Sequence, residues 1–300
     1  MSLTSAVRDA REALRAGGLR GSFLVRDLGS GAELDLDADV VFPAASLVKV
    51  PLAVATLERV ARGELDAARR VEVAPGRVAT PGPTGLSRFR HPAVVALDDL
   101  LYLAVAISDN VAADALFELT PPAAVEAELR RLGVGGIAVR HPTGSLMDTP
   151  AERFGPAEVH LAHALAIGGG AAGRGHAVTQ LDVTRASTGT ARSYADLLTA
   201  VWRADPVSAP VAARVRELLA ANVVRHRLAP DLGSDASLWS SKTGTLLNLR
   251  HEAGVVEHAD GRAYVVVAMT ESQVPAAVQP AVEALMGRVA RGLRDALRGA

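Results

Sequence analysis

The chain has 300 residues, of which 49% are hydrophobic and 22% charged, and its formal net charge is −1. The balanced charge excludes a nucleic-acid-binding protein with a basic surface, and the lack of cysteine excludes disulfides, thiol nucleophiles and cysteine-ligated zinc. Only two of the 32 basic residues are lysines, Lys49 and Lys242. Because lysine, unlike arginine, gives up its proton when its pKa is lowered, both amines are candidates for chemistry.

The first predicted element is an amphipathic helix over residues 1–20, which ends near Gly17-Gly18. It lacks the uninterrupted apolar run of a signal peptide, so we expect the chain as given to be cytoplasmic, or secreted if a leader has been removed. Two strand-like runs follow at residues 22–26 and 33–36, and the glycines between them indicate a hairpin. The longest apolar runs are too short to cross a bilayer, so no membrane partner is expected.

Helical periodicity dominates the middle of the chain, where the predicted helices cover residues 46–60, 97–108, 112–119, 123–132, 156–166 and 193–203. The glycine-rich stretch 168–175 neither follows a strand nor ends in Gly-Lys-Ser/Thr, so it indicates a surface loop and not a phosphate-binding loop. His160 and His163 share a helix but lack a third ligand at good spacing, so no zinc site is expected there.

Three further strands are predicted at residues 238–241, 251–257 and 262–270, before a closing helix over residues 274–297. Because both ends of the chain supply strands, we predict an α/β (α+β) fold with an antiparallel sheet flanked by helices. Residues 1–44 together with 207–300 would form this sheet domain. Residues 45–206 would form an inserted all-α domain, with the active site in the cleft between the two.

Three short motifs carry candidate chemistry. Ser46 and Lys49 are three residues apart, so a helix places a nucleophile beside a potential base. Ser108-Asp109-Asn110 ends a predicted helix, where it would otherwise be interpreted as a cap for the next one. Lys242-Thr243-Gly244 closes a strand, where glycine lets another group pass close to the backbone. In this order, the motifs resemble those of the penicillin-recognising serine hydrolases, and within them the class A β-lactamases.

The resemblance covers most of the chain. Residues 42–53 resemble the nucleophile helix of that family, residues 108–116 its second motif, and residues 262–272 its last strand. The resemblance implies a monomer that needs no metal or cofactor. Its substrate would be a small molecule, a β-lactam, amide or ester that carries a carboxylate.

The resemblance also implies roles for individual residues. Ser46 would attack the substrate carbonyl to give an acyl-enzyme, with Lys49 as the base or part of it. Ser108 would relay a proton to the leaving group, and Asn110 would hold the side-chain amide of the substrate. Lys242 would add positive potential, which lowers the pKa of Lys49 and attracts a carboxylate.

The remaining implied roles concern the substrate carboxylate and the oxyanion. Thr243 and Thr245 would bind the carboxylate, and the backbone N–H groups of Ser46 and Thr245 would form the oxyanion hole. The other candidate substrate-binding residues are Gly244 in the third motif and the arginines Arg227 and Arg250. His251 and Glu252 are interpreted either as bordering the pocket or as exposed polar residues of a strand.

One feature of class A β-lactamases is missing. Their Glu-x-x-x-Asn loop supplies the glutamate that activates water for deacylation, but the corresponding stretch here, Gly168 to Asp182, contains no glutamate. Glu152 and Glu158 are the nearest glutamates, and nothing in the sequence supports His176 or Asp182 as a replacement. Because loss of a general base costs about 10²–10⁴-fold, hydrolysis of the acyl-enzyme should be slow.

Three functions therefore stay open from the sequence. The first is a slow β-lactamase-like hydrolase, which would act on a β-lactam or a related cyclic amide. The second is a cytoplasmic esterase, amidase or acyl transferase that passes the acyl group to a bound acceptor. The third is a sensor that is acylated by a β-lactam once and stays acylated.

Overall fold

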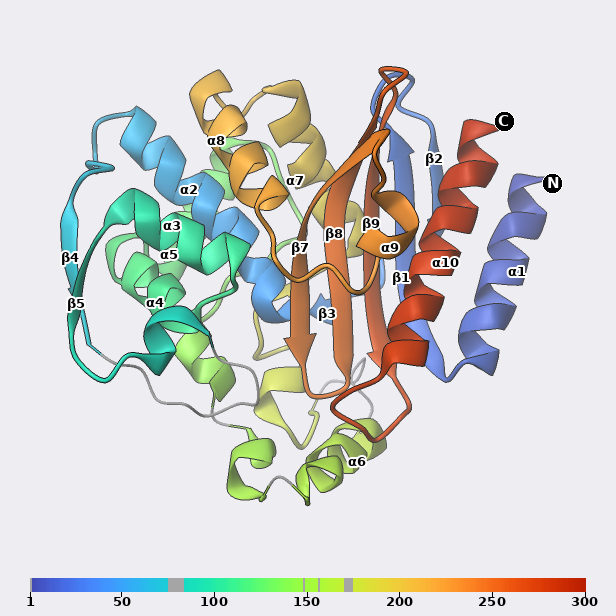
Figure 1. The fold of residues 1–300 in the computed structure, drawn as a ribbon, viewed down its shortest axis with the longest axis horizontal. Coiled ribbons are helices and arrows are strands. Elements are labelled where there is room, and N and C mark those ends of the chain that lie inside the picture. Colours follow the sequence, from blue (N-terminus) through green and yellow to red (C-terminus); the bar gives the residue numbers. More distant parts are fainter. Residues whose placement is uncertain (1, 75–83, 148, 156, 170–174) are drawn as a thin grey trace.

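The computed structural model describes residues 2–74, 84–147, 149–155, 157–169 and 175–300. A five-stranded antiparallel sheet in the order β2-β1-β9-β8-β7 lies at its centre (Figure 1). The strands are β1 (Leu19–Asp27), β2 (Glu33–Leu36), β7 (Ser237–Leu246), β8 (Leu249–His258) and β9 (Ala263–Ser272). Strand β1 pairs with β9 along its whole length, so the two ends of the chain form one sheet and the predicted fold class is confirmed.

Helices cover both faces of the sheet, which explains why β9 is buried almost without alternation. Helices α1 (Leu3–Ala16) and α10 (Pro280–Arg298) pack side by side on one face, over a core that includes Phe23, Trp239 and Tyr264. Helix α10 begins at Pro280 and not at the predicted residue 274. Proline suits the first turn of a helix because its missing N–H has no partner to lose there.

The opposite face carries the larger core and most of the helices. Helix α7 (Ala191–Arg203) packs on β1 and β9, and α8 (Ala209–Ala220) packs on β7. The nearly fully buried α2 (Lys49–Ala61) contacts α3 (Leu97–Ala106), α4 (Asn110–Leu119), α5 (Pro122–Arg131) and α8. Helix α8 was not among the predicted helices, although it packs against α2, α3 and α7. The division of the chain into two domains stays a prediction.

The remaining elements are short. Strand β3 (Phe42–Pro43) pairs with β6 (Thr188–Gly189), and β4 (Arg70–Val73) pairs with β5 (Ala93–Ala96). Helix α6 (Val159–Gly169) lies at one end of the molecule, and α9 (Ala229–Leu232) precedes β7 (Figure 1). The 3-10 turns are η1 (Ala45–Val48), η2 (Gly85–Arg88), η3 (Thr143–Met147), η4 (Pro150–Arg153) and η5 (Thr179–Leu181).

Of the glycine-rich stretch predicted to be a surface loop, residues 170–174 lie outside the described residues, and Gly168 and Gly169 end α6. In the described ranges of the chain, no helix is both long enough and apolar enough to cross a bilayer.

Candidate active site

Ser46 lies in η1, the turn that leads from β3 into α2. The predicted helix over residues 46–60 therefore opens as a tighter 3-10 turn. The first residue of this 3-10 turn, Ala45, has a φ of +46°, a conformation that costs a residue with a Cβ atom about 1–3 kcal/mol. Pro51 falls in the first turn of α2, where it breaks no interior hydrogen bond. The turn leaves Ser46 half-buried, while Lys49 is fully buried.

The amine of Lys49 is the centre of a hydrogen-bond network formed by the first two motifs. Its Nζ lies 3.4 Å from Ser46 Oγ, 2.7 Å from Ser108 O, 3.2 Å from Ser108 Oγ and 2.6 Å from Asn110 Oδ1. Burial lowers the pKa of Lys49 to about 7, although the negative charges of Asp109 and Asp114 oppose this. A large fraction of the amine is therefore neutral at pH 7 and able to accept the Ser46 proton.

Ser108 connects the two lysines. The amine of Lys242 donates to Ser108 Oγ at 2.9 Å and to the carbonyl of Thr243 at 2.9 Å. The backbone of Ser108 has a φ of +60°, which aims this hydroxyl between the two amines. Burial, followed by the nearby charges of Lys49 and Arg227, lowers the pKa of Lys242 well below its ordinary value. The hydroxyl of Ser108 is thus placed to pass a proton from one side of the site to the other.

Two carboxylates support this network, and sequence reasoning did not assign either one a role in it. Asp109 caps α4 through the N–H of Val111 at 2.9 Å, as its position predicts, and it also accepts the N–H of Leu86 at 2.6 Å. Asp114 accepts the hydroxyl of Thr143 at 2.6 Å. Burial raises the pKa of both carboxyls. The spacing of Asp114 from Asn110, four residues along one helix, is the signal that predicts its position below the site.

The third motif lies on the edge strand β7 and contacts η1. A Cβ atom at Gly244 would lie 3.1 Å from the carbonyl oxygen of Ala44 and 3.2 Å from the side chain of Leu47. Glycine therefore permits the close packing that brings Ser46 against β7. Thr243 is buried, whereas Thr245 is exposed.

Arg227 and Arg250 are both buried, and both interact with Glu283. Arg227 donates to Glu283 Oε1 at 3.0 Å, to the carbonyls of Gly244 and His251 at 3.0 and 2.9 Å, and to Thr245 Oγ1 at 2.6 Å. Arg250 donates to the carbonyls of Leu249 and Ala277, both at 2.8 Å, and lies 3.7 Å from Glu283. Arg227 thus contacts the third motif at the carbonyl of Gly244 and the residue after it, Thr245. The role of both arginines toward a substrate stays a prediction.

His251 and Glu252 are not exposed polar residues of the strand, because both are fully buried. His251 bonds the backbone of Pro43 and Thr270. Glu252 accepts hydrogen bonds from Trp239 Nε1, Ser241 Oγ and the N–H of Leu228. Both side chains face other elements of the fold because helices cover both sides of β8.

Asp182 and His176, the two loop residues considered as replacements for the missing glutamate, form hydrogen bonds within the loop and with α6. Asp182 accepts from the N–H groups of Gly175 and Thr184 at 3.1 and 2.9 Å. His176 accepts the N–H of Val178 at 2.9 Å, and its other ring nitrogen lies 3.1 Å from the carbonyl of Ala166. Their hydrogen bonds tie the loop to α6 and to its own turns.

His160 and His163 differ in environment despite sharing α6. His160 is exposed and lies 3.0 Å from the carbonyl of Ala157, whereas His163 is buried. Burial lowers the pKa of His163 to about 4. Among the described residues, no group of three or more His, Asp or Glu side chains is arranged to hold a metal ion.

An antiparallel sheet built from both chain ends, with the three motifs gathered beside its edge strand, is the class A β-lactamase fold. Residues 3–297 match the family model described as the β-lactamase enzyme family, and the chain belongs to this family. The β-lactamase regulatory protein BlaB of Streptomyces cacaoi is 62% identical to it, over 98% of each chain.

Solved structures agree on the fold. PBP-A, in one case a mutant in acyl-enzyme complex with penicillin G, superposes with a TM-score of 0.77 at 20% identity, over 100% of this chain and 98% of that one. The β-lactamase of Sphaerobacter thermophilus also gives a TM-score of 0.77, at 23% identity, over 99% and 98% of the two chains. At these identities the likeness shows the fold alone.

Proposed function

We propose that this chain is a covalent β-lactam sensor, in which Ser46 opens the lactam ring and the resulting acyl-enzyme persists. The observation that carries the proposal is the network of Lys49, whose buried amine lies within 3.4 Å of Ser46 Oγ and 3.2 Å of Ser108 Oγ. It combines a nucleophile, a base with a pKa of about 7 and a route for the proton in one place.

The acylation step follows from this geometry. The proton of Ser46 Oγ passes to the neutral amine of Lys49 while Oγ forms a bond to the carbonyl carbon of the lactam. When the C–N bond of the ring breaks, the nitrogen takes a proton through the hydroxyl of Ser108, which contacts both lysines. The backbone N–H groups of Ser46 and Thr245 stabilise the oxyanion, and Thr243 and Thr245 hold the substrate carboxylate.

The lifetime of the adduct depends on a side chain that activates water for its hydrolysis. The stretch from Gly168 to Asp182 contains no glutamate, and the carboxylate of Asp182 is held by its own loop. Within the described residues, the hydrogen bonds of Lys49 go to hydroxyl, carbonyl and amide oxygens and none goes to a carboxylate. Ser46 can therefore be acylated with Lys49 as the base, while the described residues bring no carboxylate to Lys49 to serve as the base of deacylation.

The relative from Streptomyces cacaoi supports a regulatory role. It is named a β-lactamase regulatory protein, and it shares 62% of aligned residues with this chain. A protein that forms a stable adduct reports the presence of a β-lactam without consuming it quickly. A persistent acyl-enzyme therefore suits regulation better than antibiotic destruction.

The test is time-resolved intact mass spectrometry with excess benzylpenicillin, with Ser46→Ala as the matched control. We expect an adduct with the mass of benzylpenicillin that forms only when Ser46 is present and stays for hours. Steady loss of penicillin with the protein at its free mass would replace the sensor with a hydrolase. Failure of any adduct to form would contradict both functions.

A further inference from the structure

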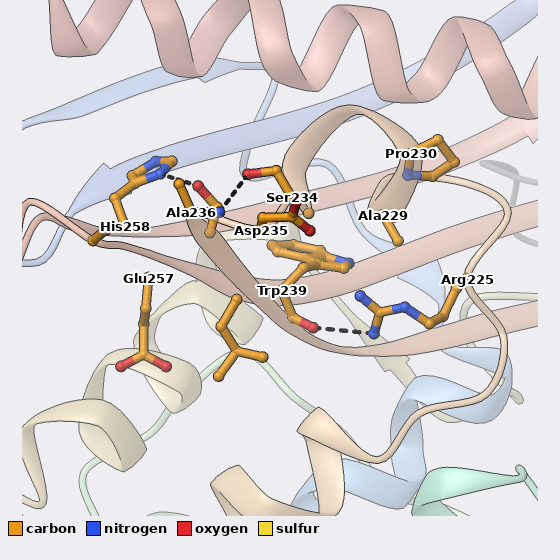
Figure 2. A pocket seen from close by; sticks show the side chains of 13 residues that line it. Arg225, Ala229, Pro230, Ser234, Asp235, Ala236, Trp239, Glu257 and His258 are labelled. Atoms are coloured by element: carbon orange, nitrogen blue, oxygen red, sulfur yellow. Dashed lines mark hydrogen bonds between the residues drawn. The ribbon is translucent and has the colours of Figure 1, made fainter.

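A pocket of about 720 Å³ lies at the start of β7, outside the three motifs (Figure 2). Its volume falls in the range of small-molecule sites. The wall consists of Arg225, part of α9, the segment 233–239 and the end of β8. Because β7 is the edge strand, its start has no neighbouring strand on this side. Thr245, at the other end of the same strand, belongs to the candidate active site.

The lining of this pocket includes one basic and two acidic side chains. Figure 2 shows Arg225 on one side and Glu257 on the other, and Asp235 also lines the wall. None of these three groups forms a salt bridge with another described residue. Leu238, which pairs with Glu257 across β7 and β8, is 54% exposed. A cation and carboxylates without a salt-bridge partner among the described residues, together with an apolar surface, match a ligand with two charged ends and an apolar body.

His258 on the same wall contributes no charge. Its Nε2 accepts from Arg294 Nη1 at 2.7 Å, so its Nδ1–H donates to Ser237 Oγ at 2.6 Å. Burial, followed by the charges of Arg294 and Arg298, lowers the pKa of His258. The lining therefore keeps one positive and two negative groups at neutral pH.

The floor of the pocket is connected to the active site. Trp239 is buried beneath the wall, and its indole Nε1–H donates to Glu252 Oε1 at 2.7 Å. The same carboxylate accepts Ser241 Oγ at 2.7 Å and the N–H of Leu228 at 2.9 Å. Ser241 directly precedes Lys242, and the negative charge of Glu252 acts on the Lys242 amine. One buried carboxylate therefore contacts Trp239 and acts electrostatically on Lys242.

We propose that this pocket is a second ligand site for a small zwitterion of dipeptide size, coupled to Lys242 through Trp239 and Glu252. The ligand carboxylate binds Arg225, its ammonium group binds Glu257, and its apolar side chain covers Leu238. The coupling, but not the binding, rests on the proposed function.

Binding of the carboxylate has a predictable effect on β7. The guanidinium of Arg225 now donates to the carbonyl of Trp239 at 3.2 Å, a long bond to a neutral acceptor. A carboxylate is the stronger acceptor and draws the guanidinium away. The start of β7 then loses a restraint, and the positioning of Lys242 loosens. We expect acylation of Ser46 to slow by about fivefold, the lower end of ordinary coupling between two sites.

The binding test uses the dipeptide Gly-Leu, with N-acetyl-Gly-Leu and Gly-leucinamide as matched probes that each lack one charge. Titrations follow the ¹⁵N indole signals of the two tryptophans, Trp202 and Trp239, which Trp202→Phe assigns. We expect Gly-Leu to shift the Trp239 signal and both capped probes to bind at least about tenfold more weakly. Equal binding of all three probes, or no saturable shift, would overturn the site.

Variants locate the two charged contacts. Arg225→Gln should remove the preference for a free carboxylate, and Glu257→Gln should weaken the preference for a free ammonium group. Arg8→Gln on α1 is the control, because this exposed arginine lies outside the pocket. If Arg225→Gln and Glu257→Gln bind Gly-Leu as the wild type does, the site is wrong.

The coupling is measured as the rate of Ser46 acylation by benzylpenicillin with and without saturating Gly-Leu. Gly-Leu should slow acylation of the wild type. Ser241→Ala, which removes a hydrogen bond to Glu252 in the link, should still show the Trp239 shift on binding the dipeptide but no change in the acylation rate. An unchanged wild-type rate would overturn the coupling. A protein that is never acylated would contradict the proposed function, and the NMR titration would still decide the site.

Discussion

The imidazole of His251 connects the sheet to the nucleophile segment through Pro43. Its Nε2–H donates to the carbonyl oxygen of Pro43 at 2.9 Å, and its Nδ1 accepts the N–H of Thr270 at 3.0 Å. Pro43 ends β3, three residues before Ser46. The ring is fully buried, so a neutral histidine on β8 holds the segment that positions the nucleophile.

Replacement of this ring should destabilise the fold. His251→Ala leaves the carbonyl of Pro43 and the N–H of Thr270 without a partner, and each such buried group costs about 1–3 kcal/mol. We expect a loss of about 2–4 kcal/mol in the free energy of unfolding, measured by urea denaturation. His160→Ala, at an exposed position on α6, is the control and should change this free energy little. A His251→Ala protein as stable as the wild type would show that Pro43 is held by other contacts.

The same residue predicts sensitivity to acid. Burial lowers the pKa of His251 to about 4 from an ordinary value of 6.5. Between these values the unfolded chain binds a proton that the folded chain does not, so stability is complete above pH 6.5 and falls as the pH drops toward 4. At pH 5 the loss from this group is about 2 kcal/mol. Urea denaturation at pH 7.5 and 5.0 should show a smaller difference for His251→Ala than for the wild type.

The ionisation of Lys49 sets the pH dependence of acylation. In the proposed function its neutral amine is the base, and burial lowers its pKa to about 7. The neutral fraction rises with pH, so the acylation rate should rise from pH 5.5 to a plateau above pH 8, with a midpoint near 7. Intact mass after short exposure to benzylpenicillin measures this rate at each pH. A rate that falls over this range would exclude Lys49 as the base.

Lys49→Arg separates the charge of this residue from its basicity. A guanidinium keeps the positive charge but does not give up its proton at these pH values. Acylation should therefore fall by about 10²–10⁴-fold, the usual contribution of a general base. Thermal unfolding of the variant shows whether the longer side chain fits the buried position. A folded Lys49→Arg protein with normal acylation would move the base to another residue.

Parts of this site follow from local sequence, and other parts depend on tertiary packing. Ser46 and Lys49 meet because one helical turn separates them, and the glycine of the third motif permits the contact of η1 with β7. By contrast, nothing local distinguishes the buried carboxylate of Glu252 from a solvated one on a strand edge. Its burial depends on α9 and Trp239, which approach from elsewhere in the chain.

The helices and strands that were predicted have a clear local pattern, whereas those that were missed depend on tertiary packing. Strand β9 is long and carries an apolar run at residues 263–269, so its existence follows from the sequence. Helix α8 has a mixed run of alanine, valine and charged residues, and its position is set by packing against α2, α3 and β7. Strands β4 and β5 pair although 19 residues separate them in the chain, and each has only four residues, so they carry little periodicity.

Arg227 packs against the third motif and contacts Gly244 and Thr245. Its replacement should change both the stability of the fold and the preference for a substrate carboxylate. The guanidinium is buried and binds Glu283, two backbone carbonyls and Thr245 Oγ1. Arg227→Met removes one partner of a buried ion pair, which costs about 3–5 kcal/mol of unfolding free energy. Arg225→Met, two residues earlier and exposed, is the matched control and should cost far less.

Arg227→Lys tests the contact with substrate. It keeps a positive charge beside Glu283, but a single ammonium group cannot reach the carbonyls and Thr245 together. Arg227 would orient Thr245 to hold the substrate carboxylate. In that case, benzylpenicillin should acylate the wild type faster than its methyl ester does. This preference should shrink in Arg227→Lys, as measured by intact mass with each compound. A preference that is the same in both proteins would limit Arg227 to the stability of the fold.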